Sequence, residues 1–329
     1  MKTLIIHAHH EPKSFCSALS QRAAEALAGA GHEVVVSDLH AMGFQPVSDR
    51  RNFTTTADAD YLKQQREETH ATEHGGFAPD VLAEIEKLEA CDLLVLSFPL
   101  WWFGMPAILK GWCDRVLAMG RVYGGGKLYE TGAGGGRKRA MLITTTGGGP
   151  QAYDGWGVNP PMDHIASMIQ HGIFWFNGFR PLEPFIAWSP ARIGDDARKE
   201  YLDQLAERMV VAFDETPIEM PRLEHHPNFG HDTQQRFMVV ARRSKPVDER
   251  YFQLIADEQA ALAEWRRRGL LHDFQAADPR PADDGADNWR AFLKLRAENR
   301  EEVERNLATL PLAEYLAFEI TELAPLAAP

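Results

Sequence analysis

The sequence predicts an α/β protein in which a parallel sheet carries helices on both faces and is followed by a smaller α+β domain. Three observations predict this fold. Apolar runs alternate with helical patterns through the first two thirds of the 329-residue chain, as they do in repeated βα units. The runs are apolar throughout, which is typical of strands buried on both faces. Residues 214–235 are rich in Pro, Glu and His and lack periodicity, and a different pattern begins after them.

The first strands and helices of the sheet follow one another from the N-terminus. Residues 3–9 (TLIIHAH) form a continuous apolar run and predict the first strand. Helical spacing over 17–31 ends at a glycine and predicts the first helix, and HEVVVSDL (32–39) predicts the second strand. An amphipathic pattern at 80–91 predicts a second helix, which leads to the third strand at 92–99.

The same alternation continues to residue 188. Residues 106–120 predict a helix whose first turn suits Pro106. RAMLITTTGGG (139–149) predicts a fourth strand that ends in a glycine cluster, and a helix at 162–178 and a short fifth strand at 183–188 follow. In sheets of this kind, ligands bind at the carboxyl ends of the strands.

A second domain is predicted after the segment that lacks periodicity. Its pattern of strand, helix, strand, strand, helix and strand is that of the ferredoxin-like split unit. These elements are expected at residues 236–243, 248–269, 270–277, 287–297, 299–311 and 315–323. The predicted division of the chain is a sheet domain at 1–213, a linker or extended arm at 214–235 and an α+β domain at 236–329.

Composition and charge exclude several classes of function. The formal net charge is −12, so neither nucleic acid nor membrane insertion is expected. The basic run at 137–139 precedes a strand, and we interpret it as solvent-exposed side chains at the start of that strand. Three cysteines without metal-ligand spacing predict reduced thiols in the cytoplasm, and no apolar stretch suits a leader or a membrane span. Because His225, His226 and His231 match no established ligand set, no metal site is expected.

Three chemically unusual loops leave the carboxyl ends of the predicted strands. They are HHEPKSFC after the first strand, PLWWFG after the third and TTGGGPQAY after the fourth. Because these strand ends share one edge of a parallel sheet, the loops are expected to converge. The adjacent aromatic side chains of PLWWFG are costly to expose, so we interpret them as the wall of a site.

Each loop offers a different contact to a ligand. Ser14 precedes the helix expected to begin near Ser17, and the backbone N–H groups of residues 14–17 are expected to point at a phosphate, with Lys13 and His9 adding positive charge. A plain N-cap serine explains this loop equally well. The rings of PLWWFG suit stacking, and the glycines of TTGGG let the backbone approach a ligand edge. No G-x-G-x-x-G fingerprint follows the first strand, so the three loops together favour a flavin pocket over a Rossmann dinucleotide site.

Five stretches of the first domain resemble the NAD(P)H:quinone oxidoreductase (DT-diaphorase) family. They are AHHEPKSFC, DLHAMGFQPVSDRRNF, FPLWWFGMPAILKGWCDRV, TTTGGGPQAY and GFRPLEP. The resemblance covers roughly residues 1–200 and implies a flavodoxin-like five-stranded parallel sheet of order 2-1-3-4-5. It also implies FAD as cofactor, with FMN as second choice, NAD(P)H as co-substrate, and a homodimer with the site at the subunit interface.

The resemblance also implies roles for individual residues. Those expected around the flavin phosphates are His9, Lys13, Ser14, Phe15 and Cys16. Those expected along the ribityl chain and isoalloxazine ring are Pro99, Leu100, Trp101, Trp102 and Phe103. Those expected at the other edge of the ring are Thr145, Thr146, Gly147, Gly148 and Tyr153. The substrate pocket is expected to contain Tyr123, Trp102 and Phe103, and the catalytic set is Tyr153, Asn159, Gly147 and Gly148.

The chain departs from the family at two of these positions. Cys16 stands where the family's first loop usually has an asparagine, which changes the side chain available to a phosphate. Asn159 stands where the familiar enzymes carry a histidine, and Asn can donate a hydrogen bond but cannot carry a proton. We expect the function to be retained, with the role of that histidine shifted to Tyr153, backbone amides or solvent.

The function implied by the resemblance is two-electron reduction of a quinone by NAD(P)H, with hydride relayed through flavin N5 in a ping-pong sequence. Two alternatives remain open. One is reduction of azo or nitro compounds in the same pocket. The other is a role as a regulatory flavoprotein subunit of a transport system.

Two stretches of the second domain, LIADEQAALAEWRRRGLL and LATLPLAEYLAFEITEL, resemble muconolactone isomerase and related dimeric α+β-barrel proteins. This resemblance implies a dimerisation or small-ligand module, with isomerase chemistry as a further alternative. Its candidate polar groups are Asp257, Glu258, His272 and Asp273, and their interpretation as surface charges of a dimerisation module is favoured.

Overall fold

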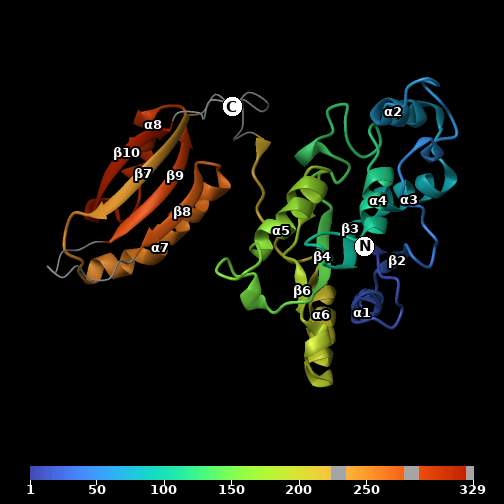
Figure 1. Ribbon diagram of the computed structural model, residues 1–329, viewed down its shortest axis with the longest axis horizontal. Coiled ribbons are helices and arrows are strands. Elements are labelled where there is room, and N and C mark those ends of the chain that lie inside the picture. Colours follow the sequence, from blue (N-terminus) through green and yellow to red (C-terminus); the bar gives the residue numbers. More distant parts are fainter. Residues whose placement is uncertain (224–234, 278–288, 324–329) are drawn as a thin grey trace. The chain divides into compact units, whose positions relative to one another are not determined.

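The computed structural model describes residues 1–223, 235–277 and 289–323 and divides the chain into two compact units, Met1–Ile218 and Glu219–Pro329 (Figure 1). The segment just after residue 213 is attached to the first unit, because the N–H of Ile218 donates to the carbonyl of Pro181 (2.7 Å). The rest of the predicted linker lies largely outside the described residues, and so do its three histidines. No helix within the described ranges has the length and apolarity that crossing a membrane requires.

The first unit contains a parallel sheet of order β2-β1-β3-β4-β5, with β6 also paired to β4. The strands are β1 (Lys2–His7), β2 (Glu33–Asp38), β3 (Leu93–Pro99), β4 (Arg139–Thr146), β5 (Arg180–Pro181) and β6 (Phe185–Trp188). The predicted order is therefore confirmed. The strand predicted at 183–188 is β6, which begins after Pro184, a residue with no N–H to give to a strand ladder. The two-residue strand β5 precedes it and was not predicted.

Helices cover both faces of this sheet. They are α1 (Phe15–Gly29), α2 (Gln64–His74), α3 (Pro79–Ala90), α4 (Ala107–Val116), α5 (Met162–Ile169) and α6 (Asp195–Val211). Helices α1 and α6 pack on one face, against residues such as Ile5 and Val95. Helices α3, α4 and α5 pack on the other, against residues such as Leu4 and Leu96 (Figure 1). Successive residues of the central strands β1 and β3 thus enter different cores, which is why these strands are largely apolar. The outer strand β2 differs from the prediction, because Val35 and Val36 are exposed.

Hydrophobic periodicity predicts neither α2 nor α6. The sequence of α2 (QQREETHATEH) is polar nearly throughout, and buried carboxylates hold the helix in place: Glu67 accepts hydrogen bonds from the N–H groups of Ala57 (2.7 Å) and Asp58 (3.0 Å). Helix α6 buries only three of its side chains, Leu205, Ala206 and Met209. Tertiary contacts rather than a strong apolar stripe therefore place both helices.

Two predicted helices have different limits in the structure. The first helix begins at Phe15 and not near Ser17, because Ser14 is its N-cap. The helix expected over 162–178 is α-helical only to Ile169 and continues as a π-helix, Gln170–Trp175. Such π-helical turns are rare and frequently lie near functional sites.

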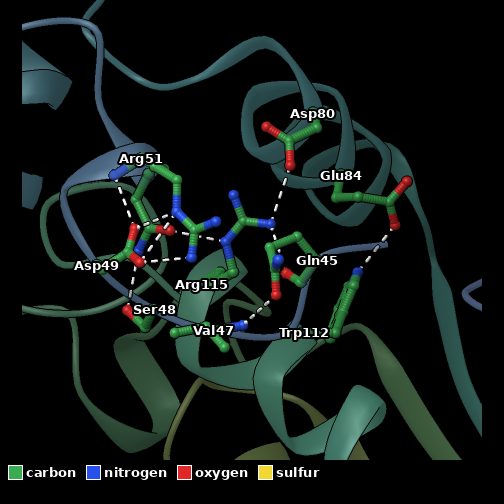
Figure 2. A network of polar contacts seen from close by, with 10 residues as sticks. Gln45, Val47, Ser48, Asp49, Arg51, Asp80, Glu84, Trp112 and Arg115 are labelled. Carbon is green, nitrogen blue, oxygen red and sulfur yellow. Dashed lines mark hydrogen bonds and ion pairs between the residues drawn. The ribbon is translucent and has the colours of Figure 1, made fainter. Parts of the chain in front are cut away.

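A buried polar network fastens the segment after β2 to α3 and α4 (Figure 2). The guanidinium of Arg115 on α4, a residue that is 3% exposed, donates to Asn52 Oδ1 (2.7 Å), the carbonyl of Gln45 (2.7 Å) and Asp80 Oδ2 (2.9 Å). Next to it, the fully buried Glu84 accepts a hydrogen bond from Trp112 Nε1 (2.8 Å). Helix α4 directly follows the loop PLWWFG, so this network fixes the base of that loop.

The second unit contains an antiparallel sheet of order β10-β7-β9-β8. Its elements are β7 (Gln235–Arg243), α7 (Glu249–Arg267), β8 (Leu271–Ala277), β9 (Arg290–Ala297), α8 (Arg300–Leu307) and β10 (Leu316–Leu323). The fourth strand lies beside the first and the third lies between the first and second, so the predicted ferredoxin-like arrangement is confirmed. Alternate residues of β7 and β9, such as Val239 and Leu293, pack with Trp265 of α7 and Val303 of α8 in one core.

Candidate functional site

The three unusual loops meet at the carboxyl edge of the parallel sheet, as predicted. The loop after β1 contacts the loop after β3 through the rings of His9 and Trp101, whose centroids are 5.7 Å apart. The loop after β3 contacts the strand end and loop of β4 twice. Leu100 N–H donates to Thr145 O (2.9 Å), and the ring of Phe103 lies 6.5 Å from that of Tyr153. Residues far apart in the sequence thus form one continuous surface.

The tip of the aromatic loop is a tight turn with left-handed backbone. Trp101 and Gly104 exchange both backbone hydrogen bonds (3.1 and 3.0 Å). The two residues between them, Trp102 and Phe103, have φ angles of 52° and 59°. Positive φ at both central positions is the pattern of a type I′ turn, which favours Asn and Gly. Strain of this kind is found preferentially at functional sites, and this turn leaves the Trp102 side chain 97% exposed.

Replacing Trp102 with glycine is therefore expected to stabilise the fold. Left-handed backbone costs a side-chain-bearing residue about 1–2 kcal/mol, and glycine loses about 0.5–1 kcal/mol of that gain through its freer unfolded chain. Because the exposed ring leaves no cavity, Trp102→Gly should raise the free energy of unfolding by about 0.5–1 kcal/mol, measured by urea denaturation. Trp101→Gly is the matched control: φ is not positive there, and its ring packs on His9 and His10, so it should destabilise. If both variants lost the same free energy of unfolding, the backbone at Trp102 would not be strained.

In the loop after β1, some of the backbone N–H groups at residues 14–17 already donate hydrogen bonds within the loop. Ser14 Oγ accepts the N–H of Ser17 (3.1 Å), and Glu11 O accepts the N–H of Ser14 (3.1 Å). These two of the four N–H groups at 14–17 are thus satisfied within the loop. The described part of the chain offers no acceptor to the N–H groups of Phe15 and Cys16. Ser14 is therefore an N-cap, and two donors at the start of α1 remain available to a ligand. Phosphate binding by these donors stays a prediction.

Two side chains of this loop can add hydrogen bonds or charge. His9 Nδ1 accepts the N–H of Glu11 (3.0 Å), so in the neutral ring Nε2 carries the proton and can donate it to a ligand. Burial and the neighbouring His10 lower the pKa of His9, and a phosphate beside it would act in the opposite direction. Lys13 is exposed and its ammonium faces solvent.

The side chain of Cys16, which stands where the family's first loop usually has an asparagine, points away from the loop. Its side chain is buried and hydrogen-bonded to the side chain of Ser97, and burial raises the pKa of the thiol to about 12. The thiol therefore faces the core, and the backbone N–H is the only group of Cys16 left for a phosphate. Phe15 likewise packs its ring partly against the core of α1 and α6.

His7 is a polar group of this region that hydrophobic periodicity conceals. It lies in β1, is 4% exposed, and places Nδ1 3.3 Å from Ser97 Oγ and Nε2 3.0 Å from Ser17 Oγ. Burial lowers its pKa, which favours the neutral ring. Through these contacts His7 ties the start of α1 to β3. A histidine inside an otherwise apolar strand is the sequence signal that could have identified it.

The loop after β4 presents backbone and one hydroxyl. Thr145 and Thr146 are buried, and Thr146 Oγ1 donates to the carbonyl of Gly148 (2.8 Å). A Cβ atom built on Gly148 would lie 3.1 Å from Tyr153 Cε2 and 3.7 Å from the Tyr153 hydroxyl, which places that hydroxyl beside the glycine. A Cβ atom built on Gly147 would meet nothing within 4 Å. The space in front of Gly147 is therefore open to a ligand.

The remaining predicted residues have more varied surroundings. Pro99 is buried at the end of β3, and Leu100 packs with Tyr153. The N–H of Asn159 donates to the carbonyl of Ala152 (3.0 Å). Tyr123 contacts the ring of Phe176 at 5.8 Å and belongs to an aromatic group with Tyr129 and Trp175. Within one chain, the ring contacts of Tyr123 are therefore with this aromatic group and not with the residues of the three loops.

These features fit a flavin. Two N–H donors at a helix N-terminus suit a phosphate. The aromatic turn suits a flat ring system, and the open side of Gly147 leaves room for the edge of that ring. Among the described residues, no group of three or more His, Cys, Asp or Glu side chains has a geometry that could hold a metal ion.

Comparisons with known families, sequences and structures identify relatives of one kind. Residues 1–210 match the model of a family described as having a flavodoxin-like fold. The chain is 40% identical over 218 residues to NAD(P)H dehydrogenase (quinone) 1 of Rattus norvegicus, covering 66% of this chain and 79% of the relative. It is 37% identical over 218 residues to human ribosyldihydronicotinamide dehydrogenase (quinone), covering 66% and 94%. A crystal structure from Klebsiella pneumoniae, described as a candidate quinone reductase, is 38% identical with a TM-score of 0.65, covering 68% of this chain and 88% of that chain.

Proposed function

Because the chain belongs to the flavodoxin-like family of NAD(P)H:quinone oxidoreductases, we propose that it binds a flavin and reduces quinones with electrons from NAD(P)H. The observation that carries this proposal is the convergence of the three loops at the carboxyl edge of the sheet. It brings phosphate donors, an aromatic turn and an open backbone edge into one place. A bound flavin supplies two-electron transfer between the nicotinamide and the quinone.

The residues of the chain have separable tasks in this proposal. The N–H groups of Phe15 and Cys16 hold a phosphate at the start of α1. Trp102 and Phe103 provide an apolar wall that excludes water from the ring. The N–H groups of Gly147 and Gly148 and the Tyr153 hydroxyl donate to the negative charge that develops at the ring edge. Asn159 retains a donor and an acceptor at the position where relatives carry an ionisable ring.

We propose FAD rather than FMN as the cofactor. The support is the resemblance of the first loop to that of the family, together with a second aromatic surface beside it. His9 and His10 are stacked at 4.9 Å, and Trp101 lies 5.5 Å from His10. Such a surface suits an adenine ring. Flavin released from the purified protein and separated by chromatography would identify the cofactor, and release of FMN alone would overturn this choice.

We also propose a homodimer with the site at the subunit interface. Trp102 and Trp156 are each 97% exposed, and exposed aromatic side chains of this size favour a protein partner. The separate location of Tyr123 also supports it, because a second copy could bring its Tyr123 to the site. Light scattering on the purified chain tests the proposal, and a monomer at micromolar concentration would contradict it.

The reaction is tested by the visible spectrum of the FAD-loaded protein, recorded without oxygen. The flavin band should bleach on addition of NADPH and return on addition of menadione. Failure to bind FAD and FMN would overturn flavin binding. A band that bleaches and does not return with any of several quinones would overturn quinone reduction alone.

Gly147→Val is expected to weaken flavin binding without affecting the fold. The added side chain enters space that is open in the protein but lies on the flavin side of the loop. The FAD dissociation constant should rise at least about tenfold, which corresponds to about 1.4 kcal/mol. The free energy of unfolding of the flavin-free protein should stay within about 0.5 kcal/mol of the wild-type value. Gly29→Ala, also with nothing within 4 Å, is the control, and unchanged FAD affinity in Gly147→Val would contradict the placement of the ring edge.

A further inference from the structure

The second unit encloses a cavity of about 230 Å³ between its sheet and helix α7. The walls are mainly alkyl side chains of leucine, isoleucine and alanine, joined by the rings of Tyr251, Phe274, Trp289 and Phe318. Gln259 and Ala276 are exposed residues that also line the cavity, so it has access to solvent. Apolar surface that lines an open cavity is costly to leave in contact with water, and the cavity therefore requires an explanation.

The size and lining of the cavity limit what it can hold. An apolar cavity of about 150 Å³ accommodates benzene, so 230 Å³ suits one ring or two fused rings. Aromatic walls favour a flat aromatic occupant through offset and edge-to-face contacts. A flexible peptide segment would bring backbone N–H and C=O groups that this apolar lining cannot satisfy.

Glu258 is the one acidic residue among those that line the cavity. It lies on α7 and is 9% exposed, and its Oε2 accepts the N–H of Leu312 (2.9 Å). Within the described residues this is its single hydrogen-bond partner, so the carboxyl retains capacity for a ligand. Burial raises the pKa of Glu258, and the second carboxyl oxygen can accept a hydrogen bond from a ligand. The other candidate polar groups, Asp257, His272 and Asp273, are exposed and do not line this cavity.

We propose that the second unit binds a planar aromatic molecule of one or two fused rings in this cavity, with the Glu258 carboxyl hydrogen-bonded to a hydroxyl group of the ligand. The ring system fills the space between α7 and the sheet. The carboxyl selects molecules with an oxygen substituent over plain hydrocarbons, because a buried polar group left without its partner is costly. This site needs no flavin, so the proposal can be tested independently of quinone reduction.

The test uses the full-length chain without flavin and two probes, 1-naphthol and naphthalene, titrated by calorimetry. Wild type should bind 1-naphthol about tenfold more tightly than naphthalene, as expected for one buried hydrogen bond. Ala276→Phe places a ring in the cavity and should weaken the binding of both probes at least tenfold. Gln275→Phe, a neighbouring exposed residue that does not line the cavity, is the matched control and should leave the binding of both probes unchanged. Glu258→Met should lower the affinity for 1-naphthol to that for naphthalene.

A second measurement keeps the proposal falsifiable if a variant fails to fold. In wild type, 1-naphthol should shift the methyl NMR signals of Leu262, Leu310 and Leu312, which line the cavity. Absence of these shifts would overturn the proposal, and so would equal affinity of folded Ala276→Phe and wild type for both probes. Equal affinities of wild type for the two probes would overturn the role of Glu258. FAD-loaded Ala276→Phe should still reduce menadione at the wild-type rate, which separates this site from the one in the first unit.

Discussion

Tyr153→Phe is expected to slow reduction of the enzyme by NADPH about 10- to 100-fold, because removal of one donor at a site of developing negative charge typically costs this much or more. The Tyr153 hydroxyl lies beside Gly148, and the ring is 9% exposed and packed between Phe103 and Trp188. Phenylalanine preserves these ring contacts. The loss should therefore appear in the rate at which the flavin band bleaches, measured by anaerobic stopped flow, and not in stability.

The presence of asparagine at position 159 should make the rate of flavin reduction depend more strongly on Tyr153. Because Asn159 cannot carry a proton, the hydroxyl is the only ionisable side-chain group among the residues expected at this edge. Tyr61→Phe is the matched control, since Tyr61 is 68% exposed and should leave the rate at the wild-type value. A wild-type bleaching rate in Tyr153→Phe would show that backbone amides alone stabilise the charge.

The parallel sheet was predictable because its central strands, such as β1 and β3, are buried on both faces. Ile5 faces one core and Leu4 the other, so the strand is apolar at every position and stands out from its surroundings. The same burial hides polar exceptions such as His7, whose partners Ser17 and Ser97 come from different elements. Pairing between distant residues leaves no periodic signal, which is why this network could not be predicted.

The sequence allowed us to predict which loops form the candidate site, but not the conformation of those loops. The carboxyl ends of β1, β3 and β4 share one edge in any parallel sheet, so the convergence of their loops follows from topology. The left-handed turn at Trp102 and Phe103 does not follow, because local preference disfavours bulky side chains there. The tertiary fold imposes that conformation, and sequence patterns report local preference only.

Glu84→Ala is expected to destabilise the first unit by about 3–5 kcal/mol, because it removes a half-buried ion pair, leaves a buried N–H without its acceptor and opens a cavity. The carboxylate is fully buried and pairs with the ammonium of Lys87. It also accepts hydrogen bonds from Ser37 Oγ (3.0 Å) and Trp112 Nε1 (2.8 Å). Alanine leaves the buried indole N–H without an acceptor and opens a cavity. For a unit of this size the midpoint of thermal unfolding should fall by about 6–20 °C, measured by the near-ultraviolet circular dichroism of its tryptophans.

The control for this variant lies on the same helix. Glu86→Ala removes an identical but exposed carboxylate from α3, so it should change stability by less than about 0.5 kcal/mol. Glu84→Gln should fall between the two, because its amide oxygen can still accept the Trp112 N–H while its amide group faces Lys87 without a charge. Because Trp112 and Arg115 lie on the helix that follows the aromatic turn (Figure 2), Glu84→Ala should also weaken FAD binding at temperatures where the fold persists. Equal stability of Glu84→Ala and Glu86→Ala would mean that the burial of this carboxylate contributes nothing, and that apolar packing alone positions α4.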